Sequence, residues 1–241
     1  MALILHIETA TSVCSAALSR DGQLISIEET NDPRSHAKKL SPFIDKIFKS
    51  QKIKASDLDA VSISLGPGSY TGLRIGVSTV KGIAYGADLP VIGISTLEAL
   101  ACRITKEKAS ELKDLRSDYL LCPMIDARRM EVYTAFFSPD MGQERKVQAD
   151  IIEAGSYSEF LEAGPVVFFG DGSDKCREII KHTNAIFISG VEPSARYMIR
   201  LAELYWERQD FLNTAYFEPF YLKDFIATVP KNKIIPPPKT T

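Results

Sequence analysis

This sequence of 241 residues has few of the side chains that hold metals, and it does not pair them. The three histidines, His6, His36 and His182, are far apart, so no helix presents two of them as metal ligands at the i, i+4 spacing. The four cysteines are equally scattered and form no C-x-x-C motif: Cys14, Cys102, Cys122 and Cys176. These absences predict no metal site, and they indicate reduced, mostly buried thiols in a cytoplasmic protein.

Charge and hydrophobicity exclude further classes of protein. The net charge of −2 and the pI near 6.0 provide no overall positive field, so any RNA contact should be local or made through a partner. The longest uncharged run, residues 60 to 73, is too short and too rich in glycine and proline to cross a bilayer. His6 and Glu8 interrupt the first apolar run, which argues against a secretory signal. We expect a cytoplasmic protein that does not bind membranes.

Residues 66 to 86 are the most informative part of the chain. They hold six of its fourteen glycines and only two charged residues, Arg74 and Lys81, and they follow a strand-like run at 61–65. A glycine-rich loop between a strand and a helix is a common way to direct backbone N–H groups at an anion. The spacing nevertheless fits neither G-x-G-x-x-G nor a Walker loop. Gly66, Gly68 and Ser69 are therefore candidate phosphate contacts of an uncommon kind, and Ser69 is also the expected N-cap.

The helix expected over 71–86 has two nonpolar arcs. One arc holds Leu73, Val77, Val80 and Ala84, and the other holds Gly72, Gly76, Thr79, Ile83 and Gly86. Glycine inside a helix costs about 1 kcal/mol relative to alanine, so these glycines need a reason. They either allow tight packing within the chain or allow a helix of another subunit to approach closely. We favour the second explanation.

Strand-like and helix-like segments occur twice in the order βββαβαβα. In the first half, strands are expected near 3–7, 13–18, 23–27, 61–65 and 91–94, with helices near 40–48, 71–86 and from 96. In the second half, strands are expected near 120–125, 131–137, 145–149, 166–169 and 185–189, with helices near 157–162, 173–181 and 194–209. This tandem α/β pattern is the layout of the two-lobe actin/Hsp70/sugar-kinase (ASKHA, RNase H-like) fold, an analogy that predicts architecture and not activity.

The same pattern predicts the domain organisation. We expect a first RNase H-like lobe over residues 1–104 and a second over 105–225, with the last helix packing back on the first lobe. Residues 226–241 are basic and rich in proline, and we expect this tail to be disordered.

Glu8 and Asp126 end the first strand of each expected lobe, where carboxylates of this superfold meet nucleotide phosphates or a metal. One hypothesis is therefore a small-metabolite kinase or ATPase that uses the cleft between the lobes. The catalytic base and phosphate loops of a kinase cannot be identified, and a nuclease needs more clustered carboxylates. No Ser-His-Asp set can be assembled around Ser69 either. We favour a structural role for Glu8 and Asp126.

Five motifs together resemble the bacterial TsaB family, formerly described as YeaZ or glycoprotease-like proteins. The matching segments are I-E-T-A-T at 7–11 with C-S-A-A-L at 14–18, G-P-G-S-Y-T-G-L-R-I-G at 66–76, V-I-G-I-S-T-L at 91–97, I-D-A-R-R-M-E-V-Y at 125–133 and E-P-F-Y-L at 218–222. The glycine motif is highly specific. The family usually has aspartate where this chain has Glu8, which puts a phosphate or magnesium role there in doubt.

The resemblance implies a non-catalytic partner of a TsaD-type catalytic subunit. With a TsaE-type ATPase, that pair transfers a threonylcarbamoyl group to the tRNA adenosine next to the anticodon. We expect a homodimer when the protein is alone, tRNA contact only through the complex, no cofactor in isolation, and ATP or ADP as a candidate ligand at the partner junction.

Two groups of residues follow as candidates, and neither is catalytic. The expected partner interface is Leu40, Phe43, Ile44, Ile47, Phe48, Gly72, Arg74, Ile75, Gly76, Thr79 and Ile83. The candidate nucleotide or phosphate contacts are Glu8, Thr9, Gly66, Gly68, Ser69 and Asp126.

Overall fold

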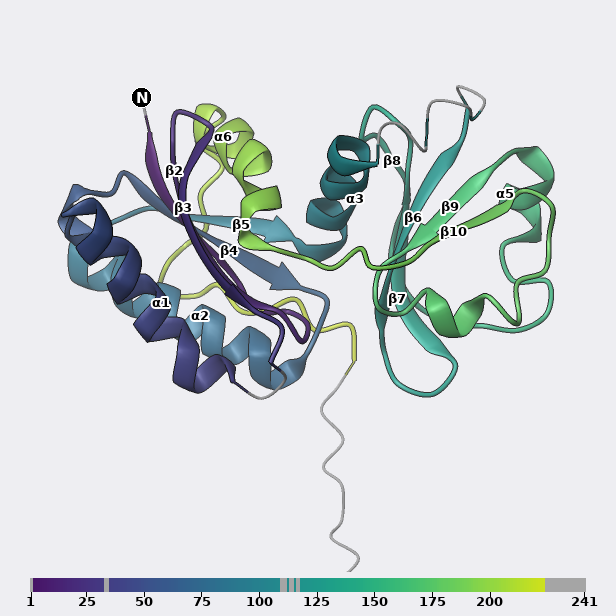
Figure 1. Ribbon diagram of the computed structural model, residues 1–241, viewed down its shortest axis with the longest axis horizontal. Helices are drawn as coiled ribbons and strands as arrows, with labels where there is room; N and C mark the ends of the chain where they lie inside the picture. The colour runs from purple at the N-terminus through teal and green to yellow at the C-terminus, as the bar shows by residue number, and fades with distance from the viewer. Residues whose placement is uncertain (1, 33–34, 109–111, 113–114, 116–117, 224–241) are drawn as a thin grey trace, which may run out of the picture.

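Two five-stranded mixed sheets, each flanked by helices, form the two lobes of the computed structural model (Figure 1), which describes residues 2–32, 35–108, 112, 115 and 118–223. The first sheet has the order β3-β2-β1-β4-β5. Its strands are β1 (Leu3–Glu8), β2 (Cys14–Arg20), β3 (Gln23–Thr30), β4 (Ala60–Gly66) and β5 (Val91–Ser95). β2 runs antiparallel to both β1 and β3, whereas β1, β4 and β5 are parallel.

The second sheet repeats this arrangement in the order β10-β9-β6-β7-β8, which is the first order read from its other edge. Its strands are β6 (Leu120–Asp126), β7 (Glu131–Phe137), β8 (Gln143–Ile151), β9 (Val166–Phe169) and β10 (Ala185–Ile188). Again the first three strands form an antiparallel meander and the last two add in parallel. The duplicated topology confirms the two-lobe α/β fold expected from the sequence.

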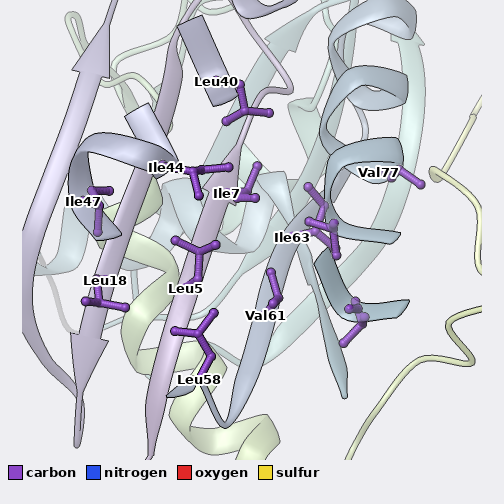
Figure 2. Packing of buried hydrophobic residues seen from close by; sticks show 14 of the residues in the cluster. Leu5, Ile7, Leu18, Leu40, Ile44, Ile47, Leu58, Val61, Ile63 and Val77 are labelled. Carbon is purple, nitrogen blue, oxygen red and sulfur yellow. The ribbon is translucent and has the colours of Figure 1, made fainter. Parts of the chain in front are cut away.

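Helices α1 (His36–Gln51) and α2 (Tyr70–Ala87) cover one face of the first sheet. Their apolar residues, which recur every three or four positions, pack on the apolar residues of β1, β2 and β4, as Figure 2 shows for Leu5, Ile7 and Leu40 among others. Pro42 lies inside α1, because the helix begins at His36, six residues earlier. The arc of α2 that holds Leu73, Val77, Val80 and Ala84 is buried as expected.

Helix α3 (Thr96–Glu107) connects the lobes and lies between the two sheets (Figure 1). Its Leu97, Leu100 and Ile104 belong to the core of the second lobe, whereas Ala99 and Cys102 belong to the core of the first. Helix α6 (Ile199–Glu207) packs on the first sheet through Leu201 and Ala202. We therefore propose a division of the lobes near residue 104, with α6 as a return to the first lobe.

One expected helix does not form. Between 173 and 181 there is only a 3-10 turn, Asp174–Cys176, followed by further turns. Local hydrogen bonds compete with a helix here, because Ser173 Oγ bonds to the carbonyl of Gly170 at 2.8 Å and Lys175 bonds to the hairpin after β6. The remaining second-lobe helix, α5 (Ser158–Ala163), forms where expected, and the proposed tail at 226–241 lies outside the described residues.

Candidate functional site

The glycine-rich turn between β4 and α2 packs on the turn that follows β1. The backbone N–H of Ser69 donates to the carbonyl of Ala10 at 2.6 Å, and the N–H of Gly72 donates to Ser69 Oγ at 3.3 Å. Gly68 approaches so closely that an added β-carbon would lie 2.2 Å from the carbonyl oxygen of Ala10. Ser69 is thus the N-cap that the sequence predicted, and its own N–H is already used within the chain instead of being free for a phosphate.

Glu8 lies beneath this turn and is fully buried. Its Oε1 accepts a hydrogen bond from the backbone N–H of Ala10 at 2.6 Å, whereas its Oε2 has no hydrogen-bond partner among the residues that the structure describes. Burial raises the pKa of Glu8 to about 7, against the opposing effect of the Ala10 hydrogen bond. The candidate contacts Glu8 and Thr9 are therefore corrected: both side chains are completely covered and cannot reach a phosphate in this structure.

His6 lies two residues earlier on β1 and is also fully buried. Its two ring nitrogens lie 2.7 Å from the hydroxyl oxygens of Ser62 and Ser19. Burial lowers the pKa of His6 to about 3, so the imidazole is neutral at physiological pH. The ring links β1 to β2 and β4 and is not available as a base or a ligand.

Asp126, the matching carboxylate of the second lobe, is exposed and ion-paired with Lys175. Lys175 also donates to the carbonyls of Arg129 and Glu131 at 2.7 Å, and it thereby holds the hairpin between β6 and β7. Arg128 and Arg129 occupy this hairpin with left-handed φ angles of 70° and 49°. Glu8 and Asp126 thus make separate local contacts in the two lobes.

Gly72 and Gly76 face the interior of the first lobe and not a second subunit. A β-carbon at Gly72 would lie 2.1 Å from the carbonyl oxygen of Thr9, and one at Gly76 would lie 2.3 Å from Thr9 Oγ1. Both glycines are buried. The expectation that they form the partner interface is wrong, because the close approach that they allow is to the turn after β1.

The other expected interface residues divide by burial. Leu40, Ile44 and Ile47 belong to the core beneath α1 and cannot contact a partner. The residues that remain at least partly accessible are Phe43, Phe48, Arg74, Ile75, Thr79 and Ile83. Helical periodicity identifies an apolar face, but it cannot say where the buried part of that face ends.

Sequence reasoning missed three exposed residues on α2. Gly82 and Gly86 have open space where a β-carbon would be, and Tyr85 between them is 89% exposed. The signal was present, because Gly86 was placed on the glycine arc and Gly82 belongs to the same glycine-rich segment. These three residues are exposed because a different side of α2 packs against the sheet, and the sequence alone does not say which side that is.

The C-terminal segment after α6 covers the charged edge of α2. The Arg74 side chain donates to the hydroxyl of Tyr221 at 3.2 Å and stacks on the Tyr70 ring at 4.3 Å. Lys81 donates to the carbonyl of Ala215 at 3.1 Å. The contacts with Tyr221 and Ala215 join residues more than 130 positions apart, so the sequence offered no way to foresee them.

The described residues contain no group of three or more histidine, cysteine or acidic side chains that could hold a metal ion. No helix among the described residues is long and apolar enough to span a membrane. The partly accessible apolar residues of α1 and α2, which are Phe43, Phe48, Ile75 and Ile83, form the candidate site.

Known proteins share this sequence and fold. The model of the TsaD family, tRNA N6-adenosine threonylcarbamoyltransferase, matches residues 28–230. The chain is 30% identical to the tRNA threonylcarbamoyladenosine biosynthesis protein TsaB of Haemophilus influenzae, over 92% of this chain and 93% of that protein. It is 29% identical to the protein of the same name from Escherichia coli, over 93% of this chain and 96% of that protein.

Two solved structures from Pseudomonas aeruginosa have a similar fold. YeaZ is 26% identical with a TM-score of 0.78, and the match covers 92% of this chain and 100% of that one. An uncharacterized protein with similarity to peptidase YeaZ is 25% identical with a TM-score of 0.80 and the same coverage.

Proposed function

This chain belongs to the TsaB family of tRNA threonylcarbamoyladenosine biosynthesis proteins, and from that premise we propose that it is the non-catalytic partner of a TsaD-type catalytic subunit. The partner would transfer the threonylcarbamoyl group to the tRNA adenosine next to the anticodon, in the cytoplasm. The relatives of this chain, which are named as threonylcarbamoyladenosine biosynthesis proteins, favour this function over the kinase or ATPase alternative. The burial of Glu8 also argues against that alternative, because the carboxylate cannot reach a nucleotide.

The observation that carries the proposed partner role is the outer face of α2. Gly82 and Gly86 lie inside the helix, where each glycine costs about 1 kcal/mol relative to alanine, yet neither touches anything that would exclude a side chain. Tyr85 is almost fully exposed beside them, and Ile75 and Ile83 are half-buried along the same helix. A second helix can approach closely at such glycines, so we place the docking surface here instead of at Gly72 and Gly76.

The same surface would serve several assemblies in turn. Alone, the protein would form a homodimer through α1 and α2, and the catalytic subunit would displace that dimer to form the working pair. A TsaE-type ATPase would join the pair, ATP or ADP would bind at the junction, and tRNA would be bound only by the complete assembly. A stable interface buries about 800 Å² on each partner, which two helices of four to five turns can supply.

The cellular function is tested by depleting this protein and measuring modified nucleosides of bulk tRNA by mass spectrometry. Threonylcarbamoyladenosine should fall in tRNAs that read codons beginning with adenine, and the intact gene should restore it. An unchanged level, in cells with no second copy, would refute the assignment.

The docking surface is tested with Gly82→Leu and Gly86→Leu. Both variants should fold, because their side chains enter open space, but they should run as monomers in light scattering and fail to co-purify with the catalytic subunit. Ala163→Leu, the same kind of change at an exposed position of α5, is the matched control and should bind normally. Normal partner binding by both glycine variants would place the interface elsewhere.

A further inference from the structure

A cavity of about 680 Å³ lies between the lobes, away from α1 and α2. Four segments line it: the turn between β2 and β3, the end of α3, the turn between β7 and β8, and the start of α6 with the 3-10 turn before it. The β2–β3 turn lies beside the first residue of β1, whereas Glu8 ends that strand. The cavity is thus distinct from the edge of the sheet at which the superfold places its phosphate-binding carboxylate. Its volume is typical of sites for small organic ligands.

The cavity gathers three positively charged side chains. Lys106, Arg196 and Arg200 line it, and within the part of the chain that the structure describes none of them has an ion pair or hydrogen bond. Two acidic residues also line the cavity. Glu107 pairs with Arg103 at 2.9 Å and accepts the hydroxyl of Tyr197. Asp140 accepts the hydroxyl of Ser138 at 2.5 Å and keeps its negative charge, so the three cations still outnumber the carboxylates that have no ion pair.

Apolar surface lies beside these cations. Leu24, near the start of β3, is 42% exposed although it is a large aliphatic residue, and Met141 and Tyr197 line the same cavity. A hollow that combines apolar walls with a few converging charged groups is the usual form of a small-molecule site. Three unpaired cations suit a ligand with two or more negative charges better than a simple carboxylate.

We propose that this cavity binds a nucleoside phosphate, with Lys106, Arg196 and Arg200 around the phosphates and the base against Leu24 and Met141. The proposal is independent of the partner role, because every residue of the site belongs to this chain. Since the lining comes from both lobes, the bound ligand would contact both of them at once. The site takes the anion through charge-assisted hydrogen bonds, which are the stronger kind in proteins.

Cys102 provides a built-in reporter for this site. It lines the cavity and is 8% exposed, whereas Cys14, Cys122 and Cys176 are fully buried. Burial raises the pKa of the Cys102 thiol to about 11, so alkylation is slow and should be followed over hours at mildly alkaline pH. In the folded protein, N-ethylmaleimide should modify Cys102 first, as read by peptide mass spectrometry, and the Cys102→Ser variant gives the background.

The test compares the rate of Cys102 alkylation with millimolar ADP, pyrophosphate or adenosine. ADP should slow the reaction at least ~10-fold and pyrophosphate should slow it less, whereas adenosine should have little effect. No protection by ADP or pyrophosphate would overturn the site. Protection by adenosine equal to that by ADP would overturn the role of the cations.

The Arg196→Glu/Arg200→Glu double variant should bind ADP at least ~10-fold more weakly in calorimetry, because each lost contact to a charged group costs about a tenfold factor or more. Both arginines are exposed, so the variant should fold. Lys38→Glu/Lys39→Glu makes the same change of charge on α1, outside the cavity, and should bind ADP as the unmodified chain does. Equal ADP affinity in the two double variants would refute the assignment.

Discussion

Gly76 and Thr9 are so close that a β-carbon on the glycine would lie 2.3 Å from the threonine Oγ1. Thr9 is fully buried in the turn after β1, and a β-carbon on Gly72 of the same helix would lie 2.1 Å from its carbonyl oxygen. Helix α2 can therefore pack this closely on the turn after β1 only because residues 72 and 76 have no side chain. The glycines of this helix therefore have two different environments. Gly72 and Gly76 are buried against the turn after β1, whereas Gly82 and Gly86 are exposed.

Alanine substitutions at Gly76 and Gly82 should have opposite effects on stability. Gly76→Ala forces a methyl group into an occupied space and should lower the free energy of unfolding by about 1–3 kcal/mol. Gly82→Ala meets nothing within 4 Å and should raise it by about 1 kcal/mol through helix propensity. Urea unfolding of the two variants checks this directly, and a stabilising Gly76→Ala would contradict the packing described here.

The sequence predicted the strands and the duplicated topology well, because alternating apolar runs and turn residues are local signals. It also predicted the buried arc of α2 from Leu73 to Ala84. It could not predict that Gly76 meets Thr9, because that contact depends on how the helix is rotated over the sheet. The missing helix at 173–181 has a similar cause, since Lys175 is held by carbonyls more than forty residues away in the chain.

Only part of the candidate site could be predicted, because the sequence encodes local periodicity but not the tertiary contacts that bury one part of a helix face. Periodicity found α1 and α2 as helices with an apolar face, but Leu40, Ile44 and Ile47 belong to the core and not to a contact surface. The covering of Arg74 by Tyr221 and the cavity between the lobes depend on tertiary contacts alone. No pattern in one segment encodes them.

Glu8→Gln should change how stability depends on pH. Folded Glu8 stays protonated up to about pH 7, whereas its ordinary pKa is 4.5, so folding takes up a proton between these values. Stability therefore falls as the pH rises through this window, by on the order of 3 kcal/mol once the pH is above 7. Glutamine stays neutral, so the variant should match the original protein below pH 4.5 and be more stable above pH 7. Chemical unfolding of both proteins below pH 4.5 and above pH 7 measures the difference. Equal stability of the two above pH 7 would exclude a raised pKa of Glu8.

His6 should make the opposite contribution. Its pKa is about 3 when folded and 6.5 ordinarily, so stability from this residue is complete above pH 6.5 and is lost as the pH falls towards 3. Between pH 4.5 and 6.5 the slopes of His6 and Glu8 oppose each other, because the folded protein carries its proton on Glu8 and the unfolded chain carries it on His6. The original protein should thus be nearly flat in this range, and Glu8→Gln should grow more stable with rising pH. NMR should find no titration of the His6 ring above pH 4.5.

The purified protein should carry no metal. Of its histidines, His6 is enclosed by two serine hydroxyls and His36 lies against the carbonyl of Val13 at 3.3 Å. Elemental analysis after purification without chelators should find no zinc or iron near one equivalent. A stoichiometric metal that disappears in a His6→Gln or His182→Gln variant would show that this expectation is wrong.

Arg129→Gly should stabilise the hairpin between β6 and β7. Arg129 has a φ of 49°, a left-handed conformation that costs a side chain about 1–2 kcal/mol and costs glycine almost nothing. Lys175 would keep its hydrogen bond, because it binds the backbone carbonyl of residue 129 and not the side chain. Arg129→Ala is the matched control, since it removes the guanidinium but keeps the strain. Thermal unfolding should rank glycine above alanine by about 1 kcal/mol, and equal stability would contradict a conformational cost at residue 129. Strained residues often persist where function needs their side chains, so the glycine variant should also be the one to assay for threonylcarbamoyladenosine in cells. A stable protein with reduced modification would assign a functional role to the arginine itself.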